Sequence, residues 1–306
     1  MSSTRREFIK SSSLLGASMS LPWQAWGLNE GKLAVACQQY TWTTFFNRAG
    51  TSWEADYEKG FKAFQDSGLR EIEFFLPEIA KVKALFAKYQ IGQRSTYVNA
   101  WLHEADKVGE TVNHIIQDAK AAKELGVEIV VVNPTPIDWN KSLDKSDYQL
   151  GVQREGLTEL ARQLKAQGQT LAYHNHDAEM RAGAREFHHM LHATDPALVK
   201  LCLDPHWIYR GAGNSSVALW DAVDMYGDRI VELHLRQSID GIWTEAFGEG
   251  DIQYDKLINY LLKHGLKPHI VLEQAIEAKT PQKYDAIEAH RMSLDHINTQ
   301  FKALKP

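Results

Sequence analysis

The chain has 306 residues, of which 44% are hydrophobic and 24% charged, a balance that argues against a disordered, collagen-like or coiled-coil protein. Two cysteines cannot provide the framework of a disulfide-rich fold, and no apolar run reaches the roughly 18–20 residues that a membrane span requires. The net charge of −5 lacks the basic excess that is typical of nucleic-acid binders.

The N-terminal segment resembles a twin-arginine export signal. Residues 3–10 read Ser-Thr-Arg-Arg-Glu-Phe-Ile-Lys, which fits the pattern Ser/Thr-Arg-Arg-x-Phe-Leu-Lys with isoleucine for leucine. A weakly apolar stretch follows over residues 11–21, and Ala-Trp-Gly at 25–27 suits cleavage. The alternative is a solvated basic helix. We expect residues 1–27 to be a signal peptide read by the twin-arginine export machinery, and the protein to be periplasmic, with no membrane attachment after the signal is removed.

From residue 28 onward we expect one domain, 28–306, in which short β-branched runs alternate with amphipathic stretches at helical spacing. The expected strands are 33–40, 71–76, 94–101, 128–133, 171–174, 198–204, 230–235 and 269–273. The expected helices are 57–67, 79–89, one ending near 126, then 148–167, 184–192, 218–225, 254–264 and 285–303. Glycines at 68, 126, 168 and 265 follow four of these helices, as C-terminal caps do.

Eight strand–helix units without a break in composition predict an α/β fold, a single (β/α)8 TIM barrel, rather than an open doubly wound sheet. No Gly-x-Gly-x-x-Gly follows a strand, which argues against a dinucleotide-binding fold. Cys37 and Cys202 fall on separate strands. Export to an oxidising compartment would permit a disulfide, but we expect two buried thiols.

The expected strand ends carry most of the polar residues that could do chemistry, and in such barrels catalytic residues lie at the C-terminal ends of the strands. Because side chains alternate along a strand, four of them would point together into the barrel mouth. These four are His174, Asp204, His234 and Glu273. Two imidazoles and two carboxylates suit one divalent ion, first Mn²⁺, Zn²⁺ or Co²⁺, with Mg²⁺ as a further option. Taken singly, such a histidine is usually a core or rim residue and such an aspartate a helix cap.

Tryptophans form a second group near the same end of the barrel. Five of them follow strand ends or lie in the next loop, and a sixth lies in the first loop: Trp42, Trp101, Trp139, Trp207, Trp243 and Trp53. Their rings could pack the loops over the barrel mouth, or they could stack on the C–H faces of a sugar. Together with the negative net charge, they favour a neutral polyhydroxyl ligand over nucleic acid.

Five short motifs carry a family resemblance. They are Tyr-His-Asn-His-Asp-Ala-Glu at 173–179, Leu-Asp-Pro-His-Trp at 203–207, Glu-Leu-His-Leu-Arg at 232–236, Gly-Glu-Gly-Asp-Ile at 248–252 and Val-Leu-Glu at 271–273. Over roughly residues 31–303 the chain resembles the xylose-isomerase-like barrel superfamily of sugar phosphate isomerases and epimerases, in a Tyr-His-Asn-His branch. Inosose dehydratases and endonuclease IV belong to the same superfamily.

The resemblance implies metal ligands Glu, Asp, His and Glu from strands five to eight. Asp204, His234 and Glu273 match this pattern, whereas His174 replaces the first glutamate. Epimerases of the family use the two glutamates as a pair of acid/base groups. The replacement therefore puts a symmetric two-carboxylate mechanism in doubt.

The resemblance implies a divalent-metal-dependent isomerase or epimerase that acts on a free sugar or sugar derivative by proton transfer next to a carbonyl. A hydratase or lyase acting on a keto-sugar is the alternative, and an endonuclease IV-like nuclease or a non-catalytic sugar-binding barrel is less favoured. A homo-oligomer is left open. Catalytic candidates besides Glu273 are Glu73, Glu179 and His176. The candidates for holding the sugar are Trp207, Arg236, Asn133, His206 and Gln274.

Overall fold

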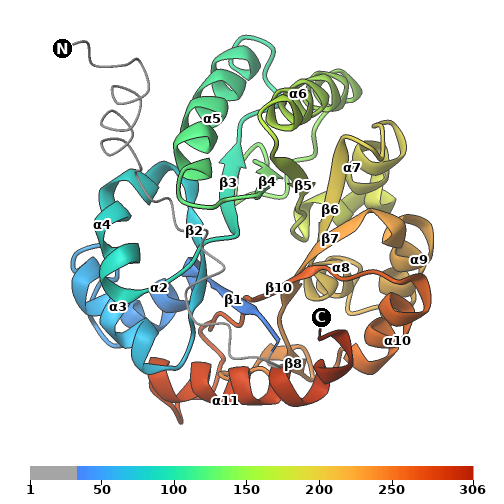
Figure 1. The fold of residues 1–306 in the computed structure, drawn as a ribbon. Coiled ribbons are helices and arrows are strands. Elements are labelled where there is room, and N and C mark those ends of the chain that lie inside the picture. The colour runs from blue at the N-terminus through green and yellow to red at the C-terminus, as the bar shows by residue number, and fades with distance from the viewer. Residues whose placement is uncertain (1–32, 306) are drawn as a thin grey trace, which may run out of the picture.

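Eight parallel strands close into a barrel in the computed structural model, which describes residues 33–305 (Figure 1). The signal peptide expected at residues 1–27 lies outside the described residues. The order around the barrel is β1-β10-β7-β6-β5-β4-β3-β2. The bounds are β1 Val35–Gln38, β2 Glu71–Phe75, β3 Ser95–Ala100, β4 Ile129–Pro134, β5 Thr170–Tyr173, β6 Val199–Leu203, β7 Ile230–Leu235 and β10 His269–Leu272. The predicted (β/α)8 barrel is confirmed.

Helices surround the barrel on all sides (Figure 1). They are α2 Gln39–Arg48, α3 Tyr57–Asp66, α4 Ile79–Tyr89, α5 Val108–Lys123, α6 Asp147–Ala166, α7 Arg181–His192, α8 Pro205–Gly211, α9 Ser216–Tyr226, α10 Tyr254–His264 and α11 Ala286–Gln300. Single 3₁₀ turns are η2 Leu76–Glu78, η3 Ala178–Met180, η4 Gly227–Arg229 and η5 Lys302–Leu304. Among the described residues, no helix combines the length and the apolar character needed to cross a membrane.

Two helices and one hairpin were not predicted. The first strand ends at Gln38 rather than at residue 40, because the Gln38 side chain accepts a hydrogen bond from the Tyr40 N–H and starts α2. Helix α8 begins directly after β6, where Asp204 is the N-cap and Pro205 occupies the first position. A two-stranded hairpin, β8 Ser238–Ile239 and β9 Ile242–Trp243, follows β7.

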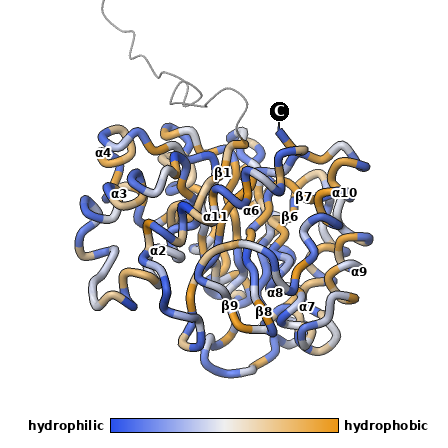
Figure 2. Tube along the Cα trace, turned by 90° about the horizontal axis from the view of Figure 1, so that it is seen from below, coloured by the Kyte–Doolittle hydropathy of each residue, from blue (hydrophilic) through white to orange (hydrophobic). Residues whose placement is uncertain are grey.

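Alternate residues of each strand serve two different layers. On β4, Val130 and Val132 belong to the large apolar core between strands and helices, whereas Ile129 and Val131 belong to a small cluster inside the barrel. Figure 2 shows the hydrophobic strands in the middle of the molecule, with the β8–β9 hairpin and α8 at the end opposite the C-terminus. Both cysteines are buried free thiols, as predicted.

The N-terminal end of the barrel buries one carboxyl group without a strong cationic partner. Glu71 and His269 start β2 and β10, and Glu71 Oε2 lies 4.0 Å from His269 Nε2. Burial raises the pKa of Glu71 to about 7, and burial lowers the pKa of His269 to about 3. Near neutral pH the imidazole is therefore uncharged, and Glu71 Oε2 has no hydrogen-bond partner.

This geometry predicts a pH-dependent effect of Glu71→Gln on stability. Between pH 4.5 and about 7 the unfolded chain releases the Glu71 proton while the folded chain retains it, so wild-type stability falls as the pH rises through this range. The amide cannot ionise. The thermal midpoint of Glu71→Gln should therefore rise relative to wild type by roughly 2–6 °C between pH 5 and pH 8. Glu110→Gln on the exposed face of α5 is the control, and an equal pH response of both variants would contradict the assignment.

Candidate active site

Four ligand-type side chains converge at the C-terminal end of the barrel. His174, Asp204 and Glu273 directly follow β5, β6 and β10, and His234 lies on β7. One ligand atom from each of the four lies within 4.8 Å of the other three, and all four residues are buried. Among residues 33–305, both ring nitrogens of His174 and the Oδ2 atom of Asp204 have no hydrogen-bond partner. Unpartnered nitrogen and oxygen donors at this spacing fit a divalent ion.

The position of Asp204 suits both functions that the sequence left as alternatives, a helix cap and a metal ligand. Its Oδ1 atom accepts hydrogen bonds from the backbone N–H groups of His206 at 2.8 Å and Trp207 at 3.0 Å, which caps α8. Its Oδ2 atom stays free to face the site. The cap therefore fixes the direction of the second oxygen.

A buried arginine neutralises part of the negative charge at the site. Arg236 lies on the same strand face as His234, and its Nη2 atom is 2.8 Å from Glu273 Oε1 and 3.9 Å from Asp204 Oδ2. Its guanidinium carbon lies 4.1 Å from the ring centre of Trp243 and 4.8 Å from that of Trp207. The two indoles thus hold the guanidinium against the carboxylates.

The charges around Arg236 set different pKa values for the two carboxyl groups. Burial alone would raise the pKa of Glu273, but Arg236 and His234 hold it well below its usual range. Burial raises the pKa of Asp204 to about 7 although Arg236 acts against it. Glu273 is therefore ionised at neutral pH.

Two further carboxyl groups lie behind His234, deeper in the barrel. His234 Nε2 is 3.2 Å from Glu73 Oε1 and 3.3 Å from Glu232 Oε1, while its Nδ1 atom is 2.9 Å from Glu273 Oε2. Burial, together with the charge of Glu73, raises the pKa of Glu232 to about 8. Glu73 and Glu232 thus orient the imidazole from behind, as outer partners of metal-binding histidines do.

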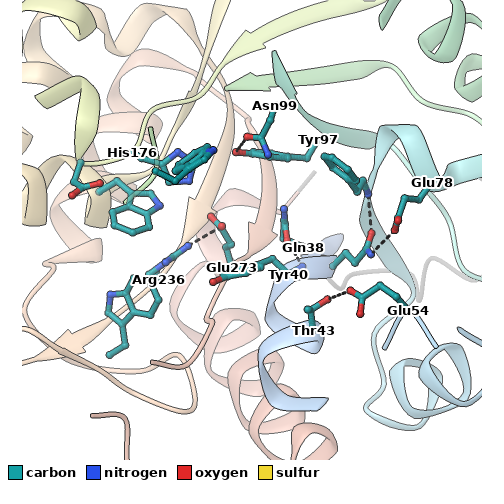
Figure 3. Close-up of a pocket in the computed structure, with 16 residues that line it drawn as sticks. Gln38, Tyr40, Thr43, Glu54, Glu78, Tyr97, Asn99, His176, Arg236 and Glu273 are labelled. Atoms are coloured by element: carbon teal, nitrogen blue, oxygen red, sulfur yellow. Dashed lines mark hydrogen bonds and ion pairs between the residues drawn. The ribbon is translucent and has the colours of Figure 1, made fainter. Parts of the chain in front are cut away.

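A cavity of about 570 Å³ opens beside Glu273 (Figure 3). It is lined by Gln38, Gln39, Tyr40, Thr43, Glu54, Phe75, Glu78, Tyr97, Asn99, Trp139, His176, Asp177, Trp207, Arg236, Trp243 and Glu273. Six residues singled out in the sequence therefore reach the cavity wall: Glu273, His176, Arg236, Trp139, Trp207 and Trp243. The volume is within the range of small-molecule binding sites.

Glu73 and Glu179 are not among the residues that line this cavity, so their candidate acid/base roles stay predictions that the lining does not support. Strand β2 continues past Glu73 to Phe75, which lines the cavity, so Glu73 lies one layer deeper. Glu179 is buried, and its Oε2 atom accepts a hydrogen bond of 2.7 Å from the His176 backbone N–H. Neither carboxyl group lines the cavity.

Three candidate sugar-binding residues do not line the cavity, and their side chains instead hold the surrounding loops in place. Asn133 donates from Nδ2 to the His174 carbonyl at 3.1 Å, and His206 Nε2 lies 2.9 Å from the Ser238 hydroxyl. Gln274 donates to two backbone carbonyls and accepts a hydrogen bond from a backbone N–H. Each of these side chains is buried and holds a loop at the barrel mouth.

The Gly-Glu-Gly-Asp-Ile motif at residues 248–252 likewise holds a loop in place. Asp251 accepts hydrogen bonds from the Ser238 hydroxyl at 2.6 Å and the Gly241 N–H at 2.9 Å, which fastens the β8–β9 hairpin. Gly250 packs so closely that a Cβ there would lie 2.2 Å from the Ser238 carbonyl oxygen. The hairpin carries Trp243 and thereby places this indole on Arg236.

Several cavity residues were missed by the sequence analysis. Tyr97 and Asn99 share the inner face of β3, and the Tyr97 hydroxyl donates to Asn99 Oδ1 at 3.2 Å. The spacing of two along β3 was a usable signal, but we placed the strand end at Trp101 instead. Trp42 and Trp53 correct the prediction for tryptophans, because both are fully buried in the apolar core, with ring centres 5.7 Å apart.

Comparisons with known proteins agree with this architecture. Residues 54–297 match the family model described as the xylose isomerase-like TIM barrel. The chain belongs to this family. A comparison with curated protein sequences finds no match.

Solved structures extend the similarity over most of the chain. A sugar phosphate isomerase/epimerase from Parabacteroides distasonis aligns with a TM-score of 0.67 at 18% identity, covering 92% of this chain and 97% of that one. L-ribulose 3-epimerase aligns with a TM-score of 0.64 at 16% identity, covering 88% and 95%. The 3-keto-D-glucoside 4-epimerase from E. coli aligns with a TM-score of 0.57 at 14% identity, covering 88% and 99%. At these identities the likeness shows the shared fold.

The buried ion pair predicts strong coupling between Arg236 and Glu273 in metal-free protein. Arg236→Met should lower the free energy of unfolding by about 3–5 kcal/mol, because it removes the guanidinium that pairs with the buried carboxylates. The double variant with Glu273→Gln should recover a large part of that loss. Urea unfolding in the presence of a chelator measures both. Arg154→Met, at a partly exposed pair with Glu155, is the control and should cost less than about 1 kcal/mol. Additive effects of the two substitutions would contradict the coupling.

Proposed function

We propose that this protein is a divalent-metal-dependent isomerase or epimerase that moves a proton at the carbon next to a carbonyl of a neutral sugar or sugar derivative. The observation that carries the proposal is the convergence of His174, Asp204, His234 and Glu273. Of these four, Glu273 lines a cavity that also presents an imidazole, two phenols and three indoles. The named activities of the similar structures, among them D-psicose 3-epimerase with D-tagatose, support the same class.

The proposed ion would be held by His174, the free Oδ2 atom of Asp204, His234 and Glu273. Its charge would polarise the sugar carbonyl and make the neighbouring C–H group more acidic. Mixed nitrogen and oxygen ligands favour Mn²⁺, Zn²⁺ or Co²⁺, with Mg²⁺ as a further option. Glu73 and Glu232 would keep the His234 ring in place from behind.

Glu273 is the proposed base. It lines the cavity, and it is ionised because Arg236 and His234 hold its pKa well below the usual range. Arg236 Nη2 lies 2.8 Å from the Oε1 atom and His234 Nδ1 lies 2.9 Å from the Oε2 atom, so each carboxylate oxygen keeps one lone pair for a further contact. The carboxylate is thus positioned to accept a proton from a sugar carbon beside it.

His176 is the proposed second acid/base group, in place of Glu73 and Glu179. Its ring lies at the cavity wall between Trp139 and Trp207, with centroid distances of 5.3 Å and 5.0 Å, and its Nδ1 atom has no hydrogen-bond partner. Burial lowers the pKa of His176 to about 4, so the imidazole is neutral at neutral pH and can accept a proton. When Glu273 takes the C–H proton, His176 can take the proton of a neighbouring sugar hydroxyl group. The imidazolium can then return its proton to carbon while Glu273 returns its own to oxygen, so that both protons end on the product.

Two other groups can hold the sugar oxygens. Burial raises the pKa of Tyr97 well above its usual value, so its hydroxyl stays protonated and can donate a hydrogen bond. The Nε and Nη1 atoms of Arg236 have no hydrogen-bond partner in the part of the chain that the structure describes, and they can donate as well. Trp139, Trp207 and Trp243 offer ring faces or edges to the sugar C–H groups.

Elimination of water from a keto-sugar is the second candidate reaction. His174 replaces one carboxylate of the usual pair, and Glu73 and Glu179 do not line the cavity. Elimination needs one base and one proton donor for the departing hydroxide, which Glu273 and Tyr97 can supply. The E. coli relative is named for a 3-keto-D-glucoside, which makes a keto-sugar a reasonable substrate to test.

The metal proposal predicts that the purified chain binds about one equivalent of Mn²⁺, Zn²⁺ or Co²⁺. His174→Ala should weaken this binding by at least 100-fold, since loss of an outer partner alone usually costs 10–100-fold. His192→Ala on the exposed side of α7 is the matched control. Titration followed by calorimetry and elemental analysis measures both variants. Equal affinity of wild type and His174→Ala would contradict the proposed ligand set.

The proton-transfer proposal predicts exchange of a sugar C–H with solvent deuterium. NMR in deuterated water would follow L-ribulose, D-psicose, D-tagatose and a 3-keto-D-glucoside with metal-loaded protein. Glu273→Gln and His176→Ala should each lower kcat by about 10²–10⁴-fold, whereas Trp207→Ala should act mainly on KM. Glu110→Gln is the control. Loss of water without exchange at the product would select the lyase, and binding without either reaction would select a non-catalytic barrel.

A further inference from the structure

The cavity extends well beyond the residues assigned to proton transfer. From Glu273 it continues toward a set of residues that we term the outer arm, of which Figure 3 shows Glu54 and Glu78 at the right. The outer arm consists of Gln39, Tyr40, Thr43, Glu54, Phe75 and Glu78. They come from α2, the segment after it, the end of β2 and η2, and none of them is needed for the reaction proposed above.

The polar groups of the outer arm are held in place by hydrogen bonds. The Thr43 hydroxyl donates to Glu54 Oε1 at 2.8 Å, and Gln39 Nε2 donates to Glu78 Oε2 at 3.3 Å. The Tyr57 hydroxyl donates to the same Glu78 oxygen at 2.6 Å. Fixed carboxylates next to aromatic rings are a suitable surface for a sugar, whose hydroxyl groups donate hydrogen bonds and whose C–H faces are apolar.

The size of the cavity exceeds that of one sugar ring. Its volume of about 570 Å³ is within the range of about 300–1,000 Å³ that is typical of sites for drug-sized ligands. A single sugar ring is smaller than such a ligand and leaves the outer arm empty when it lies against Glu273 and Tyr97. A second ring linked to the first would fill the arm.

The charge of the cavity wall selects against anionic ligands. Four carboxylate residues line it, namely Glu54, Glu78, Asp177 and Glu273, against Arg236 as the one Lys or Arg side chain among the lining residues. Arg236 is already paired with Glu273. A phosphate group in the outer arm would face Glu54 and Glu78. Lys81, whose Nζ atom lies 3.4 Å from Glu78 Oε1, is already paired there and is not among the lining residues.

We propose that the substrate is a neutral glycoside, with the reacting sugar at Glu273 and a second sugar ring in the outer arm. This inference rests on the proposed function for the place of the reacting ring. It differs from that function in a measurable way, because the outer arm should add binding affinity without taking part in proton transfer.

Calorimetric titration of the metal-loaded protein with D-glucose, cellobiose, maltose, trehalose and glucose 6-phosphate tests the proposal. At least one disaccharide should bind tenfold or more tightly than glucose, and glucose 6-phosphate should bind more weakly than glucose. The double variant Glu54→Gln, Glu78→Gln should remove the disaccharide preference and leave glucose affinity unchanged. Thr43→Val is a milder second variant expected to act in the same direction. Glu58→Gln on neighbouring α3, outside the cavity, is the matched control.

The outcomes separate this inference from the proposed function. A disaccharide preference that depends on Glu54 and Glu78 supports it even if no ligand exchanges deuterium, in which case the proposed function alone fails. Deuterium exchange into a monosaccharide combined with equal or weaker binding of all three disaccharides overturns the glycoside inference and leaves the function standing. Tighter binding of glucose 6-phosphate than of glucose also overturns it.

Discussion

The pairing of buried charges at the barrel mouth is the constraint on which the site depends. Glu273 is ionised in a buried position only because Arg236 lies 2.8 Å from one of its oxygens and His234 lies 2.9 Å from the other. An uncompensated carboxylate in this place would take up a proton. Arg236 and His234 therefore determine both the stability of this end of the barrel and the protonation state of Glu273, the proposed base.

Much of the surrounding structure serves to hold Arg236 where this pairing requires it. Trp207 comes from α8, which exists because Asp204 caps it, and Trp243 comes from the hairpin that Asp251 fastens. The two indoles enclose the guanidinium and shield it from water. Some polar residues of the family motifs therefore line the cavity or the proposed metal site. Others fix the loops that carry Trp207 and Trp243.

The depth of a residue along its strand separates these roles. Glu73 and Glu232 lie in a lower layer and contact the Nε2 side of His234, while Glu273 lies at the Nδ1 side and reaches the cavity. A shift of two residues along a strand moves a carboxylate from the cavity to the interior of the barrel. For a proton-transfer enzyme this leaves Glu273 and His176 as the groups that a substrate can meet.

The sequence by itself determined the barrel, because strand and helix periodicities repeat eight times, and it also determined the four converging residues, because alternation places them on one face. The export signal remains a prediction from sequence. Only the tertiary structure decided that Glu73 supports a histidine, that His206 holds a hairpin, and that Tyr97 lines the cavity. These assignments depend on depth and on contacts between residues far apart in the chain, which periodicity does not encode. Helix α8 could have been predicted from the sequence, because an Asp-Pro pair after a strand favours the start of a helix.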